Sequence, residues 1–141
     1  MMGTWGTGPL MSDSAQDFLD QLKELPSRER ISRVEGILAR VAEDPAIIMR
    51  EFVPEEVVAA AAVVGATVIN TSAAEWVEDE NLRRVVSGMP PQYSMLEIAG
   101  TALDAAMSYG DSWLISSWKS ENDRRSAVAQ LGEIRAALVS D

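Results

Sequence analysis

The sequence contains no cysteine and no histidine among its 141 residues. Disulfide bonds are therefore impossible, as are zinc sites built from these two residue types and mechanisms that use histidine as a base. No basic residue precedes an apolar run near the start, so we expect no secretory signal. The longest apolar stretch, residues 57–69, contains Gly65 and is short for a bilayer crossing. These absences predict a cytoplasmic protein.

Basic residues are also scarce, because 12 lysines and arginines face 22 acidic residues and leave a net charge of −10. The acidic residues are spread along the chain and do not form a tail. A negative protein repels phosphate backbones, which other proteins engage through clustered Lys and Arg. We therefore expect no nucleic-acid partner and no membrane partner. The charge favours another protein, of basic character, as the partner.

The apolar residues, 47% of the chain, are enough for one folded domain spanning residues 1–141. Their spacing predicts a helix over 13–25, and Ser27 is expected to cap a second helix over 28–43. Residues 46–53 fit either a short helix or an extended link. Residues 54–56 are expected to start a helix, and residues 57–69, which follow, are apolar on every side, which predicts a central helix covered by its neighbours. Their β-branched residues leave a strand as the alternative, but the run of alanines favours helix.

Further helices are predicted over 75–86 and 92–108. We expect one side of the helix over 92–108 to carry Tyr93, Leu96, Gly100, Leu103 and Met107. Gly110 is expected to separate it from a short helix that bears Trp113 and Trp118, and a last helix is predicted over 122–139. No alternating strand pattern appears. The prediction is an all-α fold, a compact bundle of about five to seven helices preceded by an ordered N-terminal Trp/Gly coil over 1–11.

The opening Gly3-Thr4-Trp5-Gly6-Thr7-Gly8-Pro9-Leu10 is followed by Ser12-Asp13-Ser14-Ala15 and Asp17-Phe18-Leu19. This pattern resembles a family of small bacterial proteins catalogued as domain of unknown function 4259, whose members open Met-Gly-x-Trp-Gly-x-Gly-Pro-Phe. Leu10 stands where the family has phenylalanine. The resemblance implies a helical bacterial domain of about this length. It supplies no activity and no catalytic residues.

The N-terminal motif is interpreted as structural. Trp5 is expected to fill an apolar site, Gly6 and Gly8 to permit tight turns, and Phe18 to pack in the first helix. A phosphate-binding loop is the alternative, but the motif lacks a preceding strand and a P-loop lysine.

Two groups of acidic residues are candidates for an interaction surface. The first group is Asp13, Asp17, Asp20 and Glu24, whose spacing forms one stripe on a helix, opposite Phe18. The second group is Glu75, Glu78, Asp79 and Glu80. Either group is a solvated surface or a docking site for a basic protein.

No set of residues in the sequence has the spacing of a catalytic, cofactor-binding or metal-binding site. The leading hypothesis is a non-enzymatic protein-interaction domain, of an adaptor or immunity-like kind. The alternative is a small-molecule-binding protein or a carboxylate-based enzyme with a pocket between helices. A homodimer with a structural role is a third possibility.

Overall fold

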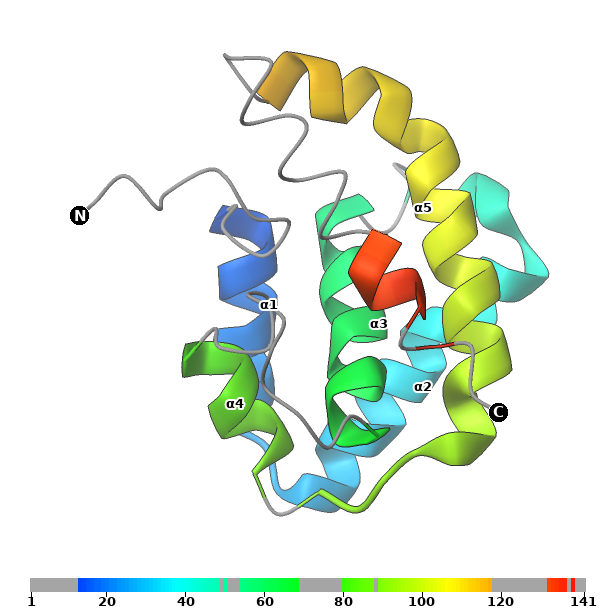
Figure 1. Cartoon of the computed structure of the whole chain (residues 1–141). Coiled ribbons are helices and arrows are strands. Elements are labelled where there is room, and N and C mark those ends of the chain that lie inside the picture. The colour runs from blue at the N-terminus through cyan, green and yellow to red at the C-terminus, as the bar shows by residue number, and fades with distance from the viewer. Residues whose placement is uncertain are drawn as a thin grey trace.

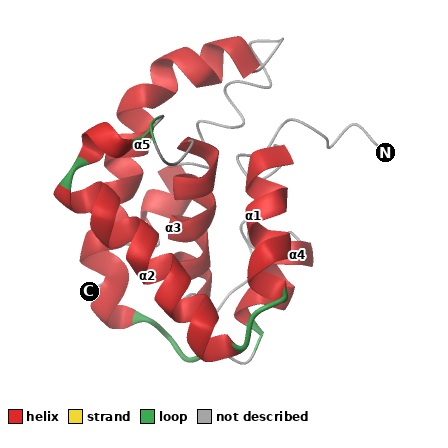
Figure 2. Cartoon of the chain, turned by 180° about the vertical axis from the view of Figure 1, so that it is seen from behind, coloured by secondary structure: helices red, strands yellow, loops and turns green. Residues whose placement is uncertain are grey.

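The computed structural model describes residues 13–48, 50, 54–68, 80–87, 89–117, 132–136 and 138. Within these ranges the chain forms helices and no β-strand, which confirms the all-α prediction (Figures 1 and 2). The α-helices are α1 (Asp13–Lys23), α2 (Ser27–Glu43), α3 (Pro54–Val68), α4 (Glu80–Val86) and α5 (Leu96–Ser117). Two 3-10 helices, η2 (Pro45–Ile47) and η4 (Tyr93–Met95), precede α3 and α5.

Helix α1 buries one side and exposes the other, as its spacing predicts. Phe18 and Leu22 are each 1% exposed, and Leu19 is fully buried. Asp17 and Asp20, on the opposite side, are exposed. Burial of such apolar side chains contributes about 1.5–3 kcal/mol each, so this stripe fixes which side of the helix faces the core.

Helix α2 begins without the expected serine cap. Pro26 occupies the N-cap position with φ −61° and ψ 156°, and Ser27 is the first helical residue. The Pro26 carbonyl accepts hydrogen bonds from the N–H groups of Glu29 (2.9 Å) and Arg30 (3.0 Å). The prediction for Ser27 is wrong because proline already fixes the backbone angle that an N-cap residue needs.

The segment after α2 resolves one ambiguity of the sequence. Asp44 accepts a hydrogen bond from the Ala46 N–H on its Oδ1 (3.2 Å) and another from the Ile47 N–H on its carbonyl (3.0 Å). These bonds form the turn of η2, whose last residue, Ile47, is buried together with Ile48, which follows it. The first part of the ambiguous segment is therefore a short helix.

Helix α3 is the centre of the bundle. It contacts α1, α2, α4 and α5, and Figures 1 and 2 show it between α1 and α5 from both sides. Residues 57–64 all have 0% exposure, through more than two helical turns. The predicted central helix is confirmed and the strand alternative is excluded. Because no side of residues 57–64 meets water, apolar alanine and valine can occupy every position of this stretch.

Helix α5 continues through Gly110 to Ser117, so the predicted break at that residue is wrong. A glycine inside a helix costs only about 1 kcal/mol relative to alanine and does not force an end, unlike proline. The ribbon of α5 changes direction in its later part (Figure 1). The backbone of Trp113 belongs to this helix, whereas its side chain and Trp118 lie outside the described residues.

A short helical segment over 132–136 lies against the bundle near α5 (Figure 1). Ile134 is fully buried, and Leu138, in a turn after the segment, is 4% exposed. The segment belongs to the helix predicted over 122–139, of which residues 122–131, 137 and 139 lie outside the described residues. None of the described helices combines the length and the hydrophobicity that a bilayer crossing requires.

Candidate interaction surfaces

The acidic stripe on α1 exists, with two differences from the prediction. Asp17, Asp20 and Glu24 are all exposed, but Glu24 lies in a turn just after the helix ends. The Lys23 ammonium lies 3.1 Å from Asp20 Oδ1, so part of the negative charge is balanced within the stripe. Asp13 starts the helix, and the position of its side chain is not described. The described stripe therefore holds three carboxylates and one ammonium.

The second acidic group falls almost wholly outside the described residues. Glu75, Glu78 and Asp79 lie outside the described residues, and Glu80 contributes only its backbone, as the first residue of α4. The motif residues Trp5, Gly6 and Gly8 also lie outside. Phe18 occupies the core, as predicted.

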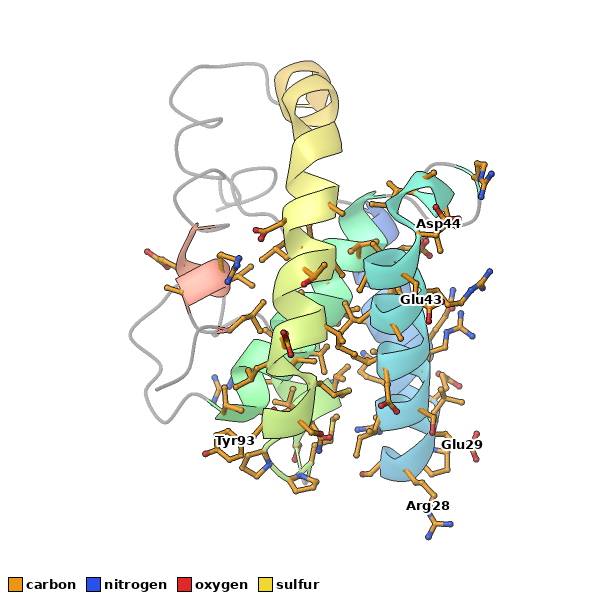
Figure 3. All side chains as sticks on the ribbon, turned by 90° about the vertical axis from the view of Figure 1, so that its right-hand side faces the viewer. Arg28, Glu29, Glu43, Asp44 and Tyr93 are labelled. Atoms are coloured by element: carbon orange, nitrogen blue, oxygen red, sulfur yellow. The ribbon has the colours of Figure 1, made fainter. Side chains whose placement is uncertain are left out.

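Helix α2 presents a different surface from α1, in which both signs of charge alternate. Arg28 and Glu29 lie at its start, and Glu43 and Asp44 lie at its end (Figure 3). All four are exposed. Across the described residues, no three acidic side chains lie close enough together to share a metal ion. Helix α2 carries four arginines beside its acidic residues, whereas the described part of the α1 stripe has one lysine, so the excess of negative charge lies on the α1 stripe.

Arg30, for which the sequence makes no prediction, joins three helices. Its guanidinium donates hydrogen bonds to the carbonyls of Leu25 (2.8 Å), Lys23 (3.0 Å), Val85 (2.9 Å) and Arg84 (3.4 Å). Lys23 is the last residue of α1 and Leu25 follows it closely, while Arg84 and Val85 lie in the last turn of α4. The C-terminal end of a helix carries partial negative charge, which attracts the cation. The cation therefore holds two helix ends to the start of α2.

A second arginine fastens segment 132–136 to α5. Arg135 donates from Nε to Asp104 Oδ1 (2.8 Å) and from Nη2 to Asp104 Oδ2 (3.1 Å). The hydrogen bond to Asp104 raises the pKa of Arg135 above its ordinary value, so the guanidinium stays charged at every working pH. Gly100, one turn before Asp104, makes room for this group, since a Cβ there would lie 3.2 Å from Arg135 Nη1.

Two helix glycines offer a matched pair of substitutions. Gly36→Ala in α2 is expected to stabilise the protein by about 0.5–1 kcal/mol, because alanine favours helix and nothing lies within 4 Å of the new methyl group. Gly100→Ala is expected to stabilise less, by a difference of about 0.5–1 kcal/mol, because the methyl group crowds the guanidinium of Arg135 and shifts it against its partner Asp104. Urea unfolding measures both values. If Arg135→Ala does not remove the difference between the two sites, the crowding explanation is wrong.

Tyr93 does not lie along the packed side of α5. The ring is 61% exposed, and the residue belongs to η4 rather than to α5. The prediction is wrong because the 3.6-residue period applies only within one continuous α-helix, and η4 has the tighter 3-10 winding.

Residues 3–130 match the sequence model of a protein family described as a domain of unknown function (DUF4259). No curated protein and no solved structure matches the chain.

Proposed function

Because the chain belongs to the family described as a domain of unknown function, DUF4259, we propose a function from the chain's own surface. The domain binds another protein of basic character through the acidic stripe of α1, defined by Asp17, Asp20 and Glu24. A basic enzyme that the domain neutralises is one concrete form of such a partner. The observation that carries the proposal is the exposure of Asp17 and Asp20 on one side of α1, with exposed Glu24 in the turn that follows.

Rigid support under the stripe favours recognition. Phe18 and Leu19 are buried at 1% and 0% exposure, and α1 contacts both α3 and α4. The carboxylates of Asp17 and Asp20 are therefore held at helical spacing before a partner arrives, which lowers the entropic cost of binding. Opposite charge on the partner accelerates association, and salt weakens that effect.

The test compares two double variants with the same change in charge. Asp17→Asn with Asp20→Asn neutralises the stripe, and Glu35→Gln with Glu43→Gln neutralises two exposed residues of α2. Each tagged protein is used to capture partners from the source cells, at low and at high salt. We expect a basic protein that binds the wild type and the α2 variant at low salt, and that the α1 variant loses.

Unfolding curves of both variants serve as the control for folding. Capture of the same proteins by the α1 variant as by the wild type would refute the proposal. Binding that is unchanged at high salt would refute its electrostatic basis.

A further inference from the structure

The end of the chain meets the bundle through one side only. In the C-terminal segment, defined here as the described residues 132–136 and 138, Ile134 is 0% and Leu138 is 4% exposed, and Arg135 lies between them. The other described residues of the segment are exposed. The Leu138 N–H donates to the Arg135 carbonyl (3.1 Å) and closes the turn that follows the short helix. The segment therefore docks through two apolar side chains and one guanidinium.

The residues that receive Arg135 belong to helix α5. Asp104 accepts two hydrogen bonds from the guanidinium, and Gly100 leaves space for it, since a Cβ there would lie 3.2 Å from Nη1. Helix α5 also packs against α2 and α3, and Figure 3 shows the segment on the opposite side of α5 from α2. When the segment leaves, α2 and α3 still hold Gly100 and Asp104 in place.

The C-terminal segment contributes a small share of the buried core. Ile134 and Leu138 are two of its side chains, whereas helices α1 to α5 supply most of the others. The side chains of Arg135 and Asp104 are 36% and 57% exposed, and ion pairs that are open to water hold weakly. An isolated helix of five residues is unstable in water, so the segment loses its helix once it leaves. Release of the segment therefore costs less free energy than unfolding the bundle.

The segment and the residues that receive it differ in their relation to the family. The family match includes all of α5, with Gly100 and Asp104, and it ends at residue 130, before the segment begins. The receiving residues thus belong to the matched stretch, and the segment that covers them does not.

We propose that the C-terminal segment is an intramolecular ligand of the α5 site, defined by Gly100 and Asp104, and that it leaves this site while α1 to α5 stay folded. The closed form is favoured because opening exposes apolar surface under Ile134 and Leu138 to water. The segment also stays attached to the chain, so its local concentration is high and it returns. The open site accepts a segment of the same pattern, with an arginine directly after one apolar residue and three residues before another. Because the acidic stripe lies on α1, either proposal can fail while the other stands.

The first experiment measures hydrogen exchange of the full-length protein by mass spectrometry, in low concentrations of urea. We expect amides of the C-terminal segment to exchange at least about tenfold faster than those of residues 57–64. Urea should change the exchange of the segment little, because its opening exposes little surface. Exchange of the segment at the rate of residues 57–64, with the same urea dependence, would overturn the proposal.

Two variants connect this exchange to the α5 site. Asp104→Asn removes the charged acceptor of Arg135, and we expect the segment to exchange about two- to fivefold faster while residues 57–64 do not change. Glu35→Gln neutralises an exposed carboxylate of α2 and should leave the exchange of the segment as in the wild type. An equal rate for the segment in Asp104→Asn and the wild type would show that Asp104 is not part of its site.

The second experiment supplies the segment as a separate molecule. A fluorescent peptide of residues 130–141 is titrated with the full-length protein and followed by anisotropy. We expect full-length Ile134→Ala to bind the peptide at least about tenfold more tightly than the wild type does, because the segment of the wild type occupies the site. A peptide with Ala136→Gln, a change at an exposed position, should bind like the native peptide. Equal binding by both proteins, or binding by neither, would refute an exchangeable ligand.

A reversal of charge tests the same pairing without removing an apolar side chain from the protein. Full-length Asp104→Arg repels its own Arg135, and we expect it to bind a peptide with Arg135→Asp more tightly than the native peptide, by about two- to fivefold. Circular dichroism checks that each protein is folded. A preference of Asp104→Arg for the native peptide would mean that the peptide binds elsewhere.

Discussion

Replacing Ala61 with leucine is expected to lower the free energy of unfolding by about 1–3 kcal/mol, because overpacking a filled core forces neighbouring side chains and backbone to move. Ala61 lies in the middle of eight consecutive residues of α3 with 0% exposure. Three added carbon atoms cannot turn toward water from such a position. Urea unfolding followed by circular dichroism measures the loss.

The matched control is Ala136→Leu, which makes the same chemical change at an exposed residue. We expect it to alter stability by less than about 0.5 kcal/mol.

Ala61→Asp places a charged side chain at the same buried position, and we expect this variant to show no cooperative unfolding transition. An unpaired buried charge costs several kcal/mol, out of a total stability of about 5–15 kcal/mol. Wild-type stability in Ala61→Leu would mean that α3 is not enclosed by its four neighbours.

Arg30→Met is expected to destabilise the protein by about 2–3 kcal/mol, because hydrogen bonds from a charged donor contribute about 1.5–3 kcal/mol each. The substitution keeps the apolar stem and removes the guanidinium. Carbonyls at the ends of α1 and α4 then lose a donor, and partial exposure of the site lets water replace some of the lost bonds. Equilibrium unfolding in urea again gives the value.

Arg33→Met is the control, since Arg33 is an exposed arginine three residues later in α2. Its expected effect is below about 0.5 kcal/mol. Arg30→Lys keeps the charge but lacks the planar fork that reaches several acceptors, so it should restore less than half of the loss. Equal effects of Arg30→Met and Arg33→Met would show that the contacts of Arg30 do not hold the helices together.

Predictions from the sequence are confirmed where the structural feature depends on residues within a single helix. The burial of α1 follows from the spacing of Phe18 and Leu22, and the central place of α3 follows from its uniform apolar composition. Each signal lies within one helix. Such signals predict which side of a helix is buried, and they do so without knowledge of its neighbours.

Predictions fail where the cause lies in another part of the chain or in a change of helix type. Arg30 bonds to carbonyls that are up to 55 residues away, and no periodic pattern reports such a pair. Gly110 suggests a break in the sequence, but α5 continues through it because glycine alone does not end a helix. Tyr93 was assigned to a packed stripe because the helical period was extended through η4, beyond the helix to which it applies.

The candidate surface was predicted in part. Asp17, Asp20 and Glu24 are exposed because a residue opposite a buried stripe faces outward. Lys23 lies beside Asp20 and balances part of its negative charge. This contact depends on side-chain geometry at the end of the helix, which the spacing alone does not specify.

The family match ends at residue 130, whereas Ile134 and Leu138 belong to the buried core. A chain shortened to the matched stretch would lose both side chains and leave Asp104 without the guanidinium of Arg135. Apolar surface beneath them would then meet water, and the shortened protein would tend to aggregate. The unit that folds is thus longer than the unit defined by similarity, and expression should include the chain through Leu138.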